Sequence, residues 1–158
     1  MSDSKPLNIW SHSDEEIGRL MSHFAHTPFV LDGVEFGSVE AFYTWLLVVG
    51  NDRKRARVAL MWGARAKHAC PKRKPDDFEY HGQNFKRNSA EHVELIRRAN
   101  RAKLDAHPAI ARAFVETRPR PIVHDIRGNN ADPFDVFCPM MCSLRDEYAV
   151  RLNSADDR

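Results

Sequence analysis

The feature that most constrains the fold of this chain is a pair of β-favouring runs followed at once by a capped apolar helix. The runs flank Asp32-Gly33, and an Asp-Gly pair in that setting is a strong signal for a two-stranded hairpin over Pro28–Phe36. Ser38 then stands at an N-cap position. The residues that follow it recur at helical spacing and stop at a glycine: Phe42, Trp45, Leu46, Val49 and Gly50. We therefore expect a helix over 39–49.

Further helices are indicated along most of the chain. The clearest covers 90–105, capped by Asn88 or Ser89, with an apolar face and with Lys103 at the margin of that face. The other expected elements are a first helix at 14–24, a basic helix after Asp52, a short helical piece at 64–69, a long polar loop at 71–86, a helix from Pro108, a strand at 121–126, a turn at 127–130 and a last helix from about Met140.

These elements predict an α+β fold. We expect a mostly helical single domain, with five or more helices around a small sheet that includes the early β-hairpin. The domain is expected over 8–152, with loose tails at 1–7 and 153–158. A length of 158 residues suits one domain.

Composition excludes several classes of protein. Apolar residues make up 42% and charged residues 29%, so the chain is neither disordered by composition nor membrane-like. No export signal is visible, and the odd number of cysteines (Cys70, Cys138 and Cys142) fits a reducing compartment. We expect a cytoplasmic location.

The charge is distributed unevenly along the chain. Residues 53–74 contain nine basic residues and no acidic one, whereas the rest of the chain has 15 basic and 22 acidic residues. Such a segment is typical either of a phosphate- or nucleic-acid-facing surface or of a solvated helix face.

The order of several short motifs resembles the NADAR (YbiA-like) N-glycosidase family. Met21-Ser-His-Phe24 and Pro28-Phe-Val-Leu-Asp-Gly33 are similar to the family's Leu-Ser-Asn-Phe and Pro-Phe-x-x-Asp-Gly, and Ser38-Val-Glu40 is similar to its Ser-x-Glu. Weaker matches follow in order over most of 17–147: Ala66-Lys67, Ala102-Lys103-Leu104 with Pro108, Thr117 before Ile122-Val123, and Leu144-Arg145.

The chain also departs from the family pattern. Leu47 stands where the family has a lysine seven residues after the glutamate, and His23 stands for the asparagine of Leu-Ser-Asn-Phe. His124 replaces the glutamate of Leu-Val-Glu, and no Trp-Gly follows Asp125 or Asp132. These departures affect the predicted activity more than the predicted fold.

The resemblance implies an enzyme that hydrolyses the N-glycosidic bond of an ADP-ribosyl or ribosyl-phosphate compound, which includes ADP-ribosylated nucleobases. Family substrates are free ADP-ribose derivatives, phosphoribosylamino pyrimidines and ADP-ribose attached to guanine. The implied partners are therefore such a small molecule and, as a further candidate, modified DNA or RNA. The resemblance implies no metal and no organic cofactor.

Glu40 is the first candidate for catalysis. Cleavage of an N-glycosidic bond develops positive charge on the sugar, so a site needs a carboxylate near C1′. By helical spacing Glu40 lies with Tyr43 and Leu47, beside the apolar stripe, and can face the edge of a cleft. The alternative is a first-turn glutamate that complements the helix dipole. We expect its carboxylate to be ionised at neutral pH and to border the largest polar cleft.

The proton for the departing base must come from another residue. Asp132 and Asp135 lie in a proline-containing loop and are candidates, although a capping or turn role also suits them. His124 is a further candidate, with a hydrogen-bonded core histidine as the alternative.

Substrate-binding candidates come from the motifs and the basic residues. Lys67, Arg73 and Lys103 can hold phosphates, or can be solvated or snorkelling side chains. Ser22 and His23 belong to the first matched motif, and Phe24, Tyr43 or Trp62 can stack on a base or pack in the core.

Other chemistries lack support in the sequence. His23 with His26 and His68 with Cys70 do not continue into a zinc pattern, and no Walker loop, Gly-x-Gly-x-x-Gly or Gly-x-Ser-x-Gly is present. Two alternatives to the glycosidase remain: a catalytically inactive ADP-ribose- or nucleotide-binding module, and a nucleic-acid-binding protein that uses residues 53–74.

Overall fold

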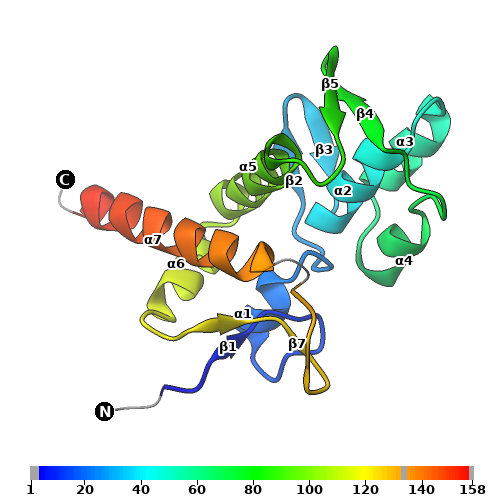
Figure 1. Cartoon of the computed structure of the whole chain (residues 1–158). Helices are drawn as coiled ribbons and strands as arrows, with labels where there is room; N and C mark the ends of the chain where they lie inside the picture. The colour runs from blue at the N-terminus through cyan, green and yellow to red at the C-terminus, as the bar shows by residue number, and fades with distance from the viewer. Residues whose placement is uncertain (1–3, 133–134, 157–158) are drawn as a thin grey trace. The chain divides into compact units, whose positions relative to one another are not determined.

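The computed structural model describes residues 4–132 and 135–156. Within these residues the chain forms seven helices and eight short strands (Figure 1), which confirms the predicted α+β class. The strands form four separate two-stranded pairs and not the one small sheet that was predicted. Residues 23–106 form one compact unit, and residues 4–22 with 107–156 form the other. The boundaries 8 and 152 of the predicted single domain stay a prediction.

The unit built from the two ends of the chain is mainly helical. Its first strand pairs in parallel with a strand more than a hundred residues later, so that the N-terminal segment is fixed to the C-terminal part. A second pair is an antiparallel hairpin around the predicted turn at 127–130. The elements are β1 (Leu7–Asn8), α1 (Glu16–Met21), α6 (Pro108–Glu116), β6 (Ile122–Val123), β7 (Asp125–Ile126), β8 (Asn129–Asn130) and α7 (Phe137–Asp156).

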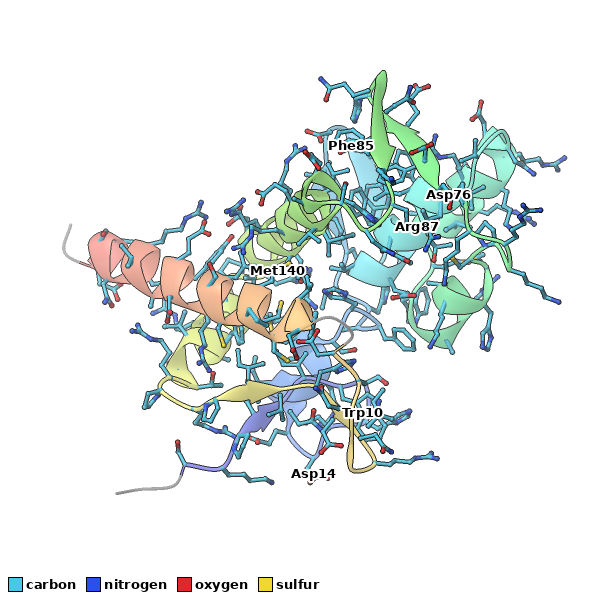
Figure 2. The ribbon with its side chains drawn as sticks, in the orientation of Figure 1. Trp10, Asp14, Asp76, Phe85, Arg87 and Met140 are labelled. Carbon is cyan, nitrogen blue, oxygen red and sulfur yellow. The ribbon has the colours of Figure 1, made fainter. Side chains whose placement is uncertain are left out.

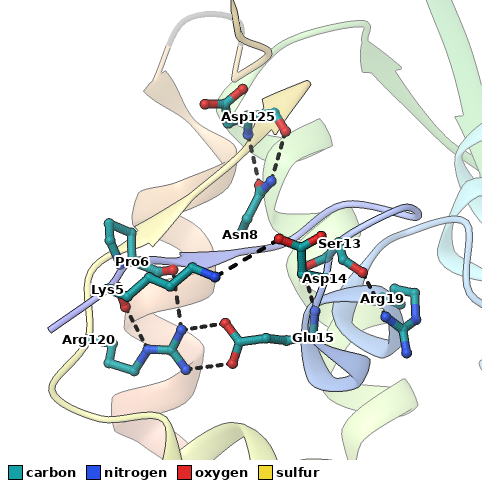
Figure 3. A network of polar contacts seen from close by, with 9 residues as sticks. All are labelled: Lys5, Pro6, Asn8, Ser13, Asp14, Glu15, Arg19, Arg120 and Asp125. Carbon is teal, nitrogen blue, oxygen red and sulfur yellow. Dashed lines mark hydrogen bonds and ion pairs between the residues drawn. The ribbon is translucent and has the colours of Figure 1, made fainter. Parts of the chain in front are cut away.

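Arg120 ties the N-terminal segment of this unit in place (Figure 3). Its guanidinium group donates to both carboxylate oxygens of Glu15, at 2.5 and 2.9 Å, and to the carbonyl oxygens of Lys5 and Pro6, at 2.7 and 3.2 Å. The buried Arg145 in turn donates to the carbonyl oxygen of Arg120 at 2.7 Å. A fork-shaped donor that meets several oxygens at once fixes the direction of each segment it contacts.

The unit of residues 23–106 contains the predicted hairpin and the helix after it. Its core gathers aromatic and aliphatic side chains from the hairpin, from that helix, from a later strand and from the long helix at its end: Phe29, Phe36, Val39, Phe42, Leu46, Leu47, Phe78, Tyr80, Leu95 and Ala99 are among them. The elements are β2 (Phe29–Leu31), β3 (Val34–Phe36), α2 (Val39–Leu47), α3 (Asp52–Ala59), α4 (Gly63–His68), β4 (Asp77–Tyr80), β5 (Gln83–Lys86) and α5 (Ala90–Ala106).

The hairpin turn has the backbone that its sequence requires. Asp32 and Gly33 both have positive φ, 48° and 82°, as a two-residue hairpin turn of the favoured kind demands. The Asp32 carboxylate also accepts hydrogen bonds from the Tyr80 hydroxyl and from Arg98, the latter at 2.8 and 3.0 Å. The hydrogen bond from Tyr80 holds the pKa of Asp32 below its usual value. The turn is therefore anchored to both β4 and α5.

Some boundaries differ from the predictions. Residues 71–86 were predicted as one long loop, but they contain the antiparallel pair β4 and β5. The sequence of β4 does alternate as a strand should, because Phe78 and Tyr80 are buried while Glu79 is exposed. The mostly polar sequence of β5 made the whole segment resemble a loop. The last helix begins at Phe137 and not at about Met140, and the first helix is shorter than 14–24.

Three apolar residues that follow α2 and α3 are exposed, among them Val49, which was predicted to lie within the first of these helices. Val49, Leu60 and Trp62 are 62%, 56% and 48% exposed. The helices end before them, α2 at Leu47 and α3 at Ala59, so the helical spacing no longer directs these side chains to the core. The cap of α3 also differs, because the side chain of Asn51 accepts the hydrogen bond from the Lys54 amide.

A close backbone approach fixes where α2 begins. The amide of Gly37 donates to the carbonyl oxygen of Ala59 at 2.8 Å, and the Ser38 hydroxyl donates to the carbonyl oxygen of Met61 at 3.0 Å. A Cβ atom at Gly37 would lie 2.7 Å from the carbonyl oxygens of both Leu60 and Met61. Only glycine therefore fits between the hairpin and the link from α3 to α4.

We predict that Gly37→Ala lowers the free energy of unfolding by about 2 kcal/mol or more, because two backbone oxygens have to move. Gly33→Ala is the matched control, since its Cβ would meet nothing within 4 Å and only its positive φ opposes the change. That control should cost about 1 kcal/mol. Denaturant titrations of both variants measure the difference, and a Gly37→Ala protein as stable as wild type would contradict the packing argument.

Candidate functional site

Glu40 lies in the first turn of α2. The N-cap role belongs to Ser38, whose hydroxyl oxygen accepts the hydrogen bond from the Ala41 amide at 3.0 Å. The backbone amide of Glu40 donates to the carbonyl oxygen of His23 at 3.0 Å. The side chain is half-buried. Among the described residues, no group forms a hydrogen bond or a close ion pair with its carboxylate.

The electrostatic environment of Glu40 combines burial with two nearby cations. Burial raises the pKa of its carboxyl group, and the positive charges of Lys67 and Lys74 act in the opposite direction. The sequence predicted an ionised carboxylate favoured by the helix N-terminus. In the structure the net effect is a raised pKa of Glu40, and the two lysines are the groups that favour its ionised form.

The face of α2 that carries Glu40 also carries Tyr43 and Leu47. Tyr43 is half-buried, and its ring stacks on that of His92 with centroids 5.6 Å apart and planes 14° apart. Burial lowers the pKa of His92 to about 4, so this histidine is neutral at physiological pH. Leu47 is 1% exposed. One face of α2 thus carries a carboxylate, an aromatic ring and a buried aliphatic side chain in succession.

Two more predicted residues lie near this face. The Nζ atom of Lys67, on α4, is 5.8 Å from the centroid of the Phe24 ring. Phe24 is half-buried, and its carbonyl oxygen accepts a hydrogen bond from the amide of Gly63, at the start of α4. The motif around Phe24 and the helix that carries Lys67 are therefore held together.

His23 connects the site to α5, the helix that also carries Lys103. The Asn100 side-chain amide donates to Nε2 of His23 at 3.0 Å, so that nitrogen is the acceptor. Lys103 lies one turn further along α5 and is fully buried, whereas the sequence placed it at the margin of the apolar face. Burial lowers the pKa of Lys103 to about 7.

The remaining predicted residues belong to the other unit. Ser22 is buried, and its amide donates to the carbonyl oxygen of Arg19. His124 donates through Nδ1 to the carbonyl oxygen of Ile9 at 2.6 Å. The Asp132 carboxylate accepts from three amides at the start of α7, those of Val136, Phe137 and Cys138, at 2.8 to 3.1 Å.

These contacts favour structural roles for Asp132 and His124. Burial alone would raise the pKa of Asp132, but the hydrogen bonds from the amides of Cys138 and Phe137 outweigh it and lower the pKa. An acid with a lowered pKa is a poor proton donor at neutral pH. The helix-capping role of Asp132 is therefore the better supported one, and catalysis by either residue stays a prediction.

Two cavities are hollowed into the unit of residues 23–106. One, of about 400 Å³, is lined by Val34, Glu35, Trp45, Asp52, Arg55, Ala56, Ala59 and Leu60. The other, of about 370 Å³, is lined by Leu47, Val49, Pro71, Arg73, Lys74, Pro75 and Asp76. Glu40 is not among the lining residues of either. It lies two turns of α2 from Leu47, which lines the second cavity.

Sequence reasoning missed Lys74 as a neighbour of Glu40. The sequence shows Lys74 only as one member of the basic run, because the 33 residues between it and Glu40 hide their proximity. A single sequence contains no signal that indicates the proximity of Lys74 to Glu40. Arg73, which was predicted, lines the second cavity beside it.

The described residues contain no cluster of three or more His, Cys, Asp or Glu side chains that could hold a metal ion. The three cysteines, Cys70, Cys138 and Cys142, are free thiols. No helix in the described part of the chain is both long enough and apolar enough to cross a membrane.

Comparison with solved structures identifies the fold. The NMR structure of the E. coli protein YbiA matches with a TM-score of 0.65 over 96% of this chain and 88% of YbiA. The chain has a YbiA-like fold. The two sequences are 19% identical, so this likeness concerns the fold alone. No protein-family model matches the sequence, and no curated protein does either.

We predict that the Glu40 carboxyl group titrates above the usual glutamate range. Replacing either neighbouring cation, in Lys67→Met or Lys74→Met, should raise the Glu40 pKa further, because each lysine favours the ionised form. The exposed Lys72→Met is the matched control and should leave it unchanged. Carboxyl ¹³C titration by NMR gives these values, and a Glu40 pKa in or below the usual range would refute the description of its environment.

Proposed function

We propose that this protein is an N-glycosidase that hydrolyses the N-glycosidic bond of an ADP-ribosyl or ribosyl-phosphate compound. The observation that carries the proposal is the state of Glu40: a half-buried carboxylate without a hydrogen-bond partner among the described residues, with the charges of two lysines acting on it. Titratable groups that are partly buried without a hydrogen-bond partner, and whose pKa is shifted by that burial, are characteristic of functional sites. The YbiA-like fold and the matched motifs support the same activity.

The chemistry assigns a role to each group. As the bond from C1′ to the base nitrogen breaks, the electron pair leaves with the base and positive charge develops on the sugar ring. Ionised Glu40 stabilises that charge or takes a proton from the water that attacks C1′. The departing base also takes up a proton, which attacking water can supply as its O–H bond breaks. Lys67 binds an anionic part of the substrate.

The proposal is tested by Glu40→Gln. This change keeps the size of the side chain and removes the charge, so base release should fall by about two to four powers of ten while ligand affinity changes much less. Base release from a panel of ADP-ribosyl and ribosylamino compounds is followed by chromatography. Glu91→Gln is the matched control, since Glu91 is an exposed glutamate in the first turn of α5, and it should keep full turnover.

The stability of the variant separates catalysis from folding. Because burial raises the folded-state pKa of Glu40, its ionisation opposes folding once the pH exceeds the unfolded-state pKa. Glu40→Gln should therefore be at least as stable as wild type at neutral pH. If wild type binds the ligands yet releases no base from any of them, the protein is a nucleotide-binding module and the glycosidase proposal fails.

A nucleic-acid-binding role is the second candidate, favoured by an exposed aromatic pair within a basic surface. Trp62 is 48% exposed and stacks on the exposed His26, with centroids 4.0 Å apart and planes 19° apart. Exposed cations without a carboxylate partner among the described residues come from the same segment: Arg53, Arg57, Arg65, Lys67, Lys72, Arg73 and Lys74. Aromatic platforms among cations are typical of single-strand binding.

For this second role, we predict that Trp62→Ala weakens binding of a single-stranded oligonucleotide about tenfold, because one stacked base is lost. Arg57→Gln should weaken it and reduce its salt dependence. Leu60→Ala, which changes another exposed apolar residue, is the control. Fluorescence anisotropy at several salt concentrations measures both effects, and the role is excluded if the oligonucleotide does not bind or if Trp62→Ala binds it as wild type does.

A further inference from the structure

The cavity of about 400 Å³ is a groove between β3 and one face of α3. Its lining includes Val34 and Glu35 of β3 and, from α2, Trp45. The α3 side contributes residues at helical spacing, which therefore share one face of that helix: Asp52, Arg55, Ala56 and Ala59, followed by Leu60. None of these residues has a part in the chemistry proposed for Glu40.

The backbone of β3 is unpaired at Glu35. In a hairpin with a two-residue turn, the residues that flank the turn form a hydrogen-bonded pair, and here these are Leu31 and Val34. The next pair, Val30 with Glu35, is then of the non-hydrogen-bonded kind. The amide and the carbonyl group of Glu35 therefore point away from β2. Among the described residues, no group forms a hydrogen bond with them.

This edge of β3 is the one that faces α3. The amide of Gly37 points the same way as that of Glu35, because the two lie one strand period apart. It donates to the carbonyl oxygen of Ala59 at 2.8 Å, and Ala59 is both the last residue of α3 and a lining residue of the groove. The end of α3 thus covers the edge at Gly37 and leaves it open at Glu35.

The apolar walls of the groove are formed without any ligand. Trp45 is half-buried, and the guanidinium group of Arg55 lies over its ring with the central carbon 3.7 Å from the ring centroid. Arg55 also donates through Nε to the carbonyl oxygen of Trp45 at 3.1 Å. Ala56 and Leu60 are exposed on the α3 side. Exposed apolar residues gathered around a groove are typical of an interaction surface.

Each side of the groove also carries an exposed carboxylate. Glu35 lies on β3, and Asp52 is the first residue of α3. Within the described part of the chain, neither forms an ion pair. The cation of the lining, Arg55, is already held over Trp45. The charge of the groove therefore favours an occupant with a positive side chain.

The β4–β5 hairpin of the same unit shows how an edge strand is protected. Figure 2 labels Asp76 and Arg87, which close the base of this hairpin: the amide of Arg87 donates to the carbonyl oxygen of Asp76 at 2.8 Å. Most residues of β5 are polar and exposed, namely Gln83, Asn84 and Lys86. Polar and charged side chains on an edge strand oppose pairing with another chain. The edge of β3 instead borders an apolar groove.

We propose that this groove binds an extended peptide of a partner protein, which pairs with Glu35 as an added strand and carries a basic residue between two apolar ones. The residue opposite Glu35 points to the same face as Glu35, so its positive charge meets that carboxylate. The two neighbours point to the face of Val34 and meet the apolar walls. In strand addition the backbone bonds supply affinity and the alternate side chains supply specificity.

A blocked pentapeptide, Ser-Val-Lys-Val-Ser, is the probe, and NMR of the ¹⁵N-labelled full chain follows its binding. We expect a saturable shift of the Glu35 amide and slower hydrogen exchange there, because the amide gains a carbonyl partner. The same peptide with an N-methylated lysine should bind about tenfold more weakly, since a backbone donor is lost. If the N-methylated peptide binds equally well, or the parent peptide does not bind, the proposal is overturned.

Filling the groove tests its location. Ala56→Trp places a ring at an exposed lining residue of α3, so peptide binding should weaken about tenfold with little effect on stability. Ala64→Trp is the matched control, because Ala64 is an exposed alanine of α4 that does not line the groove. Thermal unfolding verifies that both variants fold. Equal binding by the two variants would contradict the assignment.

The charge of the groove is tested by Glu35→Gln. This change should weaken binding of the lysine peptide about threefold, which is the size expected of one exposed ion pair. Glu91→Gln, at an exposed glutamate of α5, is the control and should bind the peptide as wild type does. Weaker binding in both variants to the same extent would reduce the effect to net charge and count against the proposed pairing.

A second copy of this chain is the other occupant that an open strand edge can take. Sedimentation equilibrium of the full chain distinguishes the two, and we expect a monomer. A dimer that Ala56→Trp dissociates would assign the edge to a second copy and overturn the peptide proposal. Base release enters none of these measurements, so their outcome is independent of the proposed glycosidase activity.

Discussion

The contact of Gly37 with the link between α3 and α4 is the constraint on which the arrangement of the site depends. The hairpin ends and α2 begins at this point, and a side chain at Gly37 would collide with the backbone oxygens of Leu60 and Met61. Ser38 caps α2 and bonds to Met61 with the same hydroxyl group. The first turn of α2 is therefore fixed against the chain that enters α4, and Glu40 is presented near the cation of Lys67.

The carboxyl group proposed for catalysis opposes the stability of the fold in which it sits. Burial raises the pKa of Glu40, so its charge is held at a cost that a solvated position would not impose. The ion pairs and hydrogen bonds elsewhere in the same unit, such as those on Asp32, stabilise the surrounding elements. Such a difference between structural groups and a proposed catalytic group is expected where a rigid scaffold supports a site.

Local chemistry explains which features the sequence could predict. The Asp32-Gly33 turn and the Ser38 cap each depend on interactions within two or three residues. Their structures can therefore be predicted from the neighbouring residues in the sequence. The complete burial of Lys103 and the proximity of Lys74 to Glu40 depend on how distant segments pack against one another. The periodicity of apolar residues in the sequence does not reveal such packing. The β4–β5 hairpin was missed for a related reason: its second strand exposes most of its polar side chains and so lacks a clear alternation.

The central claim is that Glu40 faces the anomeric carbon of a nucleotide-linked sugar. A crystal structure of Glu40→Gln with an uncleaved ADP-ribosyl substrate tests it most directly. We expect C1′ at about 3.5 Å from the side-chain amide of residue 40, a distance at which the wild-type carboxylate would stabilise the developing charge. A substrate bound elsewhere, with residue 40 in contact only with solvent or with its own helix, would contradict the account.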